Sequence, residues 1–153
     1  EDGAGTVEAG ERIVSKLVAE GDPRVTLYRD MNVAIGGTET AIRAVQEIQF
    51  RFLMAASAAG VIDMQVDADG LRALMKAQEG EMRRQMAASS LAQSAYIYRD
   101  FTTDEVAAYV KALENPLMQE VYELLNAVQN EITANRFEVL AYRMAEMHPG
   151  QDI

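Results

Sequence analysis

The sequence predicts an all-α protein, a single-domain helical bundle of about six helices of which two are long. Apolar residues recur at intervals of three and four along most of the chain, the spacing that places them on one face of a helix. Residues typical of helix starts and stops divide this pattern into six segments. No segment shows a strand pattern of comparable strength, because the best candidate, residues 61–66, is short and single.

The first three helices follow from their apolar spacing and from the residues that flank them. The first is predicted for residues 6–20 and ends at Gly21, a common stop residue. The second covers residues 22–35 and opens with the pair Asp22-Pro23, a cap followed by the residue best tolerated at a first helical position. The third covers residues 38–59, and its second half is apolar on nearly every side. We therefore expect that half at the centre of the fold.

The fourth helix is the first of the two long ones. Asp67 caps a pattern that continues to about Asp100, which would span around 48 Å if the helix is unbroken. Gly80 lies in its middle and costs about 1 kcal/mol relative to alanine. A bend is expected there.

The last two helices are separated by a short link with clear capping signals. Thr102 and Glu105 have the spacing of a capping box, and the helix that they open runs to Leu113. Asn115 then caps the sixth helix, which opens with Pro116. Its apolar stripe is expected to face the core. The stripe lacks an apolar residue at Asn135-Arg136, where a kink or a change of packing partner is plausible. The stripe consists of Val121, Leu124, Leu125, Val128, Ile132, Val139, Tyr142 and Met147.

Length and composition indicate one acidic domain covering residues 1–153. The chain is 49% hydrophobic, enough for one core, and residues 1–5 and 148–153 are expected to fray. Its net charge of −10 repels phosphate backbones and anionic headgroups, so nucleic acid is not expected as a partner. The most apolar run, residues 52–62, is too short for an integral membrane segment.

The residue inventory argues against the common catalytic and metal centres. There is no cysteine and only one histidine, which disfavours thiolate zinc sites, cysteine nucleophiles and serine–histidine catalysis. The run from Asp67 to Gly70 superficially resembles a calcium loop, but it lacks the closing glutamate and fits helix capping better. His148 is preceded by Ala145 rather than by the glutamate of a di-iron motif. We therefore predict no catalytic residues, no metal and no cofactor.

Two features are candidates for a ligand site. Arg51 lies in an apolar run, where it either lines a pocket for a carboxylate or phosphate or pairs locally with Glu47, one turn earlier. The fourth helix carries a stripe of methionine, glutamine and serine where leucine would be usual, which permits a soft cavity or groove for a flexible ligand. Close helix approach or exposure to solvent would also explain it. The candidate ligand-binding residues are Arg51, Gln78, Met82, Gln85, Met86 and Gln93.

The segment from Tyr98 to Leu125 resembles the core of the domain-of-unknown-function 2059 family of bacterial exported proteins. The match consists of Phe101, Thr102, Glu105, Val106 and Pro116, and it departs from the family pattern at Asn115 and Met118. The resemblance implies an all-helical, exported or periplasmic protein without an assigned activity. It implies no catalytic residues.

Three function hypotheses follow. The leading one is an uncharacterised, exported, non-enzymatic module that binds a protein partner or a small apolar ligand. The second is a structural homodimer formed through exposed apolar faces of the long helices, which an apolar face without a cavity would favour. The third is a carboxylate-dependent hydrolase or lyase, for which Glu47, Arg51 and Asp63 are the best candidates.

Overall fold

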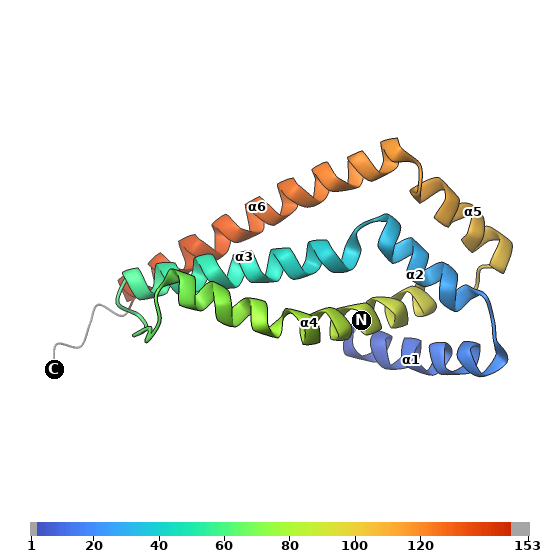
Figure 1. Ribbon diagram of the computed structural model, residues 1–153, viewed down its shortest axis with the longest axis horizontal. Coiled ribbons are helices and arrows are strands. Elements are labelled where there is room, and N and C mark those ends of the chain that lie inside the picture. Colours follow the sequence, from blue (N-terminus) through green and yellow to red (C-terminus); the bar gives the residue numbers. More distant parts are fainter. Residues whose placement is uncertain (1–2, 148–153) are drawn as a thin grey trace. The chain divides into compact units, whose positions relative to one another are not determined.

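The computed structural model describes residues 3–147, and these form six α-helices and no strand (Figure 1). The prediction of an all-α protein with two long helices is confirmed, because α4 has 30 residues and α6 has 32. The start of α1 lies three residues before the expected one, and residues 61–66 form a connector. The expected fraying of residues 148–153 lies outside the described part of the chain. The helices are α1 (Gly3–Glu20), α2 (Arg24–Ala34), α3 (Gly37–Ala58), α4 (Ala68–Ile97), α5 (Thr103–Leu113) and α6 (Pro116–Met147).

Side-chain caps fix the starts of three helices where the sequence places them. The Thr102 hydroxyl accepts the Glu105 N–H at 3.3 Å, and the Glu105 carboxylate accepts the Thr102 N–H at 2.8 Å, which completes the predicted capping box. The Asp67 carboxylate accepts the Gly70 N–H at 2.8 Å at the start of α4. Asn115 does the same for the N–H of Leu117 in α6, at 3.0 Å.

Glycines end α1 and α3 in the left-handed conformation. Gly21 has φ +65° and Gly60 has φ +72°. A side chain is strained at such angles, so glycine is the natural residue to reverse the chain there. After α3, the N–H of Val61 donates to the carbonyl of Ala56 at 2.9 Å, which satisfies a free carbonyl of the last turn.

The helices gather into two compact units. Unit 1 comprises residues 1–40 and 83–124, and unit 2 comprises residues 41–82 and 125–153. Unit 1 therefore contains α1, α2, α5 and the second half of α4, whereas unit 2 contains most of α3, the first half of α4 and most of α6. The sequence shows no linker between the units, because α3, α4 and α6 each contribute residues to both.

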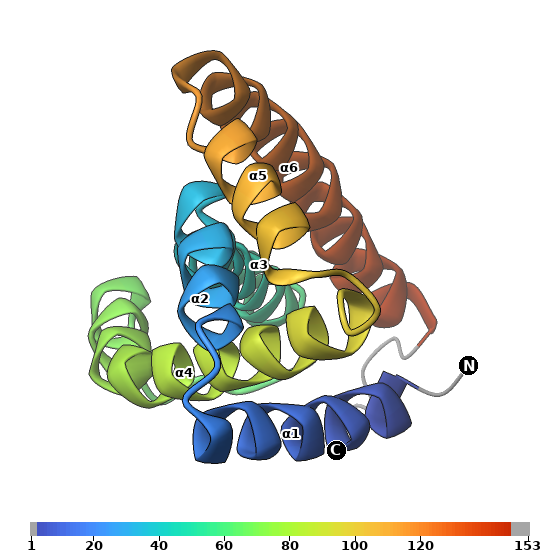
Figure 2. The same ribbon diagram turned by 90° about the vertical axis from the view of Figure 1, so that its right-hand side faces the viewer.

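Unit 1 has the larger hydrophobic core. Tyr28 is fully buried, and its ring stacks on that of Tyr98 with centroids 6.4 Å apart. In α1, Gly10 is buried where this helix crosses α4 at Ala92. Figure 1 and Figure 2 show α1 beside the second half of α4. The absence of a side chain at Gly10 permits that close approach. The buried core residues of this unit are Leu17, Val25, Tyr28, Met31, Ala95, Val106, Val110 and Leu113.

Unit 2 is built on small residues. Ala55 and Ala56 of α3 pack with Ala141 of α6, and Phe52 lies half-buried against them. The expectation that the second half of α3 is buried is therefore correct at Ala55 and Ala56, whereas Ala58 is exposed. The expectation that the apolar stripe of α6 faces the core is wrong, because Ala134 and Ala141 are its buried residues. Alanine permits close backbone approach, and the larger apolar side chains lie on the other side of the helix.

Candidate functional site

Arg51 joins α3 to α6 within unit 2. Its Nε donates to the Glu47 carboxylate at 2.7 Å, and its two terminal nitrogens donate to the Glu131 carboxylate at 3.0 Å each. One of these nitrogens also donates to Asn135 Oδ1 at 2.9 Å. The predicted local pair with Glu47 is thus present. Sequence reasoning missed Glu131 and Asn135, which lie about 80 residues further along the chain.

The electrostatics of this cluster stabilise the charged forms of its members. The hydrogen bonds that Arg51 donates to Glu131 and then to Glu47 raise the pKa of Arg51 above its usual range. The hydrogen bonds that Glu131 accepts from Arg51 lower the pKa of Glu131. Both donor edges of the guanidinium are occupied, so Arg51 links α3 to α6 through ion pairs and hydrogen bonds. We call Arg51 with Glu47, Glu131 and Asn135 the Arg51 clasp. A carboxylate or phosphate ligand would have to displace Glu131.

The residues suggested for carboxylate catalysis do not form a constellation. Glu47 and Arg51 are paired, whereas Asp63 lies exposed in the connector after α3 and accepts a hydrogen bond from Gln65 at 3.2 Å. General acid–base chemistry requires groups that converge on one reacting atom. The hydrogen bonds of the described residues join Glu47 to Arg51 and Asp63 to Gln65.

The methionines and the glutamines of the α4 stripe differ in burial. Met82 and Met86 are half-buried, whereas Gln78, Gln85 and Gln93 are exposed. For the glutamines, the structure agrees with the alternative of exposure to solvent. A glutamine side chain keeps its amide hydrated when it is exposed, so the face of α4 that carries the glutamines points to solvent. Ligand binding by these residues stays a prediction.

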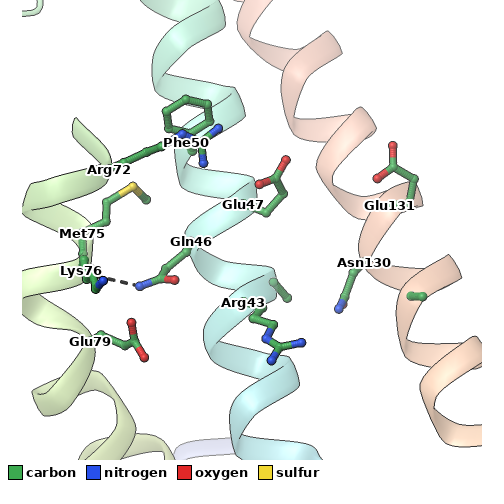
Figure 3. A pocket seen from close by; sticks show the side chains of 12 residues that line it. Arg43, Gln46, Glu47, Phe50, Arg72, Met75, Lys76, Glu79, Asn130 and Glu131 are labelled. Carbon is green, nitrogen blue, oxygen red and sulfur yellow. Dashed lines mark hydrogen bonds between the residues drawn. The ribbon is translucent and has the colours of Figure 1, made fainter. Parts of the chain in front are cut away.

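A polar groove of about 500 Å³ lies between α3, α4 and α6 in unit 2 (Figure 3). Gln46 of α3 donates to the carbonyl of Met75 in α4 at 3.5 Å across its floor. Arg72 of α4 places its guanidinium 3.7 Å from the centroid of the Phe50 ring. The groove is lined by Arg43, Ala44, Gln46, Glu47, Phe50, Arg72, Met75, Lys76, Glu79, Ala127, Asn130 and Glu131.

Charged side chains of both signs line this groove. Three of them are cationic and three are carboxylates, and two of these carboxylates, Glu47 and Glu131, are held by Arg51. Among the described residues, no group of acidic or histidine side chains could hold a metal ion. Arg51 and the predicted residues of α4 do not line this groove.

The side of α6 that points away from its buried alanines carries large apolar side chains. Val128 is 60% exposed and Ile132 is 48% exposed. We call the set Leu125, Val128, Ile132, Val139 and Tyr142 the outer face of α6; all five lie in unit 2. Contiguous apolar patches of this kind are typical of protein–protein contact sites.

Sequence reasoning identified these residues but assigned them to the core. Periodicity shows that a helix has an apolar face, and it does not show what covers that face. The available signal was the residues on the opposite side: Ala134 and Ala141, seven positions apart, form a small-residue stripe suited to close helix packing. None of the described helices has the length and hydropathy that a membrane span requires.

Comparisons with known proteins leave the family open. No protein-family model, curated protein or solved structure matches this chain. The resemblance to the domain-of-unknown-function 2059 family therefore stays a prediction.

Proposed function

We propose that the protein is a non-enzymatic interaction module that binds a protein partner through the outer face of α6. The observation that carries this proposal is the inverted burial of the helix, in which alanines are buried and Val128, Ile132 and their neighbours are exposed. Fully burying an aliphatic side chain of this size contributes about 1.5–3 kcal/mol. The outer face offers four aliphatic residues and Tyr142, each 48–60% exposed, so association would add about half of that contribution for each of them.

A protein partner fits the chain better than a small apolar ligand. The groove of unit 2 is lined by charged side chains from all three of its helices, and one of them, Glu131, is held in an internal ion pair by Arg51. The outer face is convex, because it lies on a single helix. A helix presented in this way is usually recognised by another helix or by an apolar groove of a larger partner.

The compartment belongs to the same proposal. The resemblance of residues 98–125 to an exported family supports an exported or periplasmic setting. A partner in that setting would be another secreted protein or a further copy of the same chain.

Site-specific photo-crosslinking in the cells that naturally produce the protein tests the proposal. A benzophenone amino acid in place of Tyr142 should give a crosslinked protein adduct on illumination. The matched control carries the same amino acid in place of Leu74 of α4, an exposed apolar residue of unit 2 outside the outer face. An absence of adducts at position 142, or equal adducts at both positions, would refute the interface.

A further inference from the structure

The outer face of α6 follows a strict heptad spacing. Leu125, Ile132 and Val139 are separated by seven residues, and Val128, Asn135 and Tyr142 form a second series three residues later. Successive members of the two series alternate by three and four positions, which is the a and d pattern of a coiled coil. Met118 and Val121 extend both series toward the start of the same helix.

These positions are available for pairing in the single chain. The five apolar members within unit 2 are all exposed, with values from 48% for Ile132 and Tyr142 to 60% for Leu125 and Val128. The a and d residues of a coiled coil are buried only when the facing helix is present. Among the described residues of unit 2, no helix covers these five side chains.

Charges flank the two series in a self-complementary order. Glu131 and Glu138 occupy the g positions, whereas Arg136 and Arg143 occupy the e positions, each five residues further along. In a parallel pair of helices, a g residue faces the e residue five positions later in the partner. Two copies of α6 therefore place Glu138 opposite Arg143, and they place Arg136 opposite Glu131, which Arg51 of the same chain already holds. An antiparallel pair would place glutamate against glutamate.

One polar residue interrupts the apolar series. Asn135 occupies a d position, where its side-chain oxygen accepts a hydrogen bond from Arg51 at 2.9 Å and its side chain also hydrogen-bonds to Glu131. A single polar residue in a coiled-coil seam specifies register. In a parallel dimer in register, Asn135 of one copy lies opposite Asn135 of the other, so it faces no apolar seam residue.

We infer that the partner of the outer face is a second copy of this chain, and that two α6 helices associate in parallel and in register as a two-stranded coiled coil. This inference rests on the proposed function and names its partner. The heptad spacing supplies the seam, the charge order selects the parallel orientation, and Asn135 fixes the register.

Sedimentation of the purified full chain over a concentration series is the first test. Ile132→Asp places two unpaired carboxylates in the seam and should raise the dimer dissociation constant by about 100-fold or more. The control, Leu74→Asp, makes the same kind of change at a residue 54% exposed outside the seam, and it should leave the constant unchanged. Helical circular dichroism confirms that each variant is folded.

The charge order is tested by reversing one pair outside the Arg51 clasp. Glu138→Arg alone and Arg143→Glu alone should each weaken the dimer by about tenfold, since each places like charges together at two symmetric positions. The double variant exchanges the charges and should restore the original constant. A double variant as weak as the single ones would overturn the parallel pairing.

Orientation and register are tested in a chain that has no cysteine of its own. Val128→Cys and Tyr142→Cys, made separately, lie about 21 Å apart along the helix. Under mild oxidation both should form disulfide-linked dimers if the helices are parallel, whereas an antiparallel pair allows at most one. Leu74→Cys is the control. This test stays informative if Ile132→Asp fails to fold.

The outcomes separate this inference from the proposed function. A purified chain that is monomeric at all concentrations, or that forms trimers, overturns the two-stranded dimer. If Tyr142-directed crosslinks then contain a different protein, the outer face remains the interface and its partner is heterologous. If no crosslinks form at all, both proposals fail.

Discussion

The close crossing of α1 and α4 in unit 1 makes Gly10→Ala the sharpest test of the fold. A Cβ built on Gly10 falls on the carbonyl oxygen of Ala92 and lies 2.5 Å from the carbonyl carbon, whereas ordinary contacts are 3.4–4 Å. The obstacle is backbone, so no rotamer change relieves it. The two helices must separate by about 1 Å, which loosens the packing around Leu17 of the same helix.

The expected cost combines two opposing effects. Forcing an extra methyl group into a packed contact costs about 1–3 kcal/mol. Replacing a helical glycine by alanine returns about 0.5–1 kcal/mol, because the unfolded chain loses freedom. The net loss should be about 1 kcal/mol, which lowers the midpoint of urea unfolding by about 0.5 M.

Urea unfolding followed by far-ultraviolet circular dichroism measures this loss. Gly5→Ala is the matched control in α1, since nothing lies within 4 Å of the Cβ that it would add. It should leave the midpoint unchanged or raise it slightly. If Gly10→Ala unfolds at the same urea concentration as Gly5→Ala, the close crossing of the two helices is refuted.

Three further outcomes follow from the structure. Thr102→Ala should lower the free energy of unfolding by about 1 kcal/mol in urea titrations, and Thr102→Ser should restore most of it, because the cap needs a hydroxyl. The pKa of Glu105 is lowered by its hydrogen bonds from the Thr102 backbone and hydroxyl, and that of Asp22 by its hydrogen bond from the Arg24 side chain. A lowered folded-state pKa gives stability that is complete above the unfolded value and lost as pH falls through the folded value, so the urea midpoint should drop below about pH 4. Glu105→Gln should show a smaller drop over that range. Asn135→Leu should lower the dimer dissociation constant in sedimentation and blur the register seen with single cysteines, since an all-apolar seam tolerates sliding.

Helix boundaries were predictable because local signals determine them. The caps use hydrogen bonds between residues close in the sequence: Thr102 bonds to Glu105, and Asn115 bonds to Leu117. Such contacts can be recognised without knowledge of the fold. The start of α1 was harder to place, because its first turn has no acidic residue to mark it.

Packing partners were not predictable in the same way. The apolar stripe of α6 was visible in the sequence, yet the helix packs through Ala134 and Ala141 instead. Both sides of the helix are compatible with burial, and the choice depends on whether Ala55 and Ala56 of α3 meet small or large residues. Contacts of this kind are decided by tertiary geometry.

The candidate site was predictable only where its contacts are local in the sequence. The pair Arg51–Glu47 lies one helical turn apart and follows from spacing alone. The bidentate partner Glu131 lies on another helix, so nothing near Arg51 in the sequence indicates it. The burial of the α4 glutamines stayed open because a mixed stripe does not show which of its members face inward.

The interruption at Asn135-Arg136 has a chemical explanation rather than a geometric one. The sequence stripe misses an apolar residue there, which suggested a kink or a change of packing partner, but α6 is one helix from Pro116 to Met147. Asn135 keeps its heptad position while it accepts a hydrogen bond from Arg51, and Arg136 takes the flanking position that a partner glutamate requires. Arg51 thereby restricts the orientation of the one polar residue in the seam. The clasp between α3 and α6 and the proposed register of the dimer consequently depend on the same hydrogen bond.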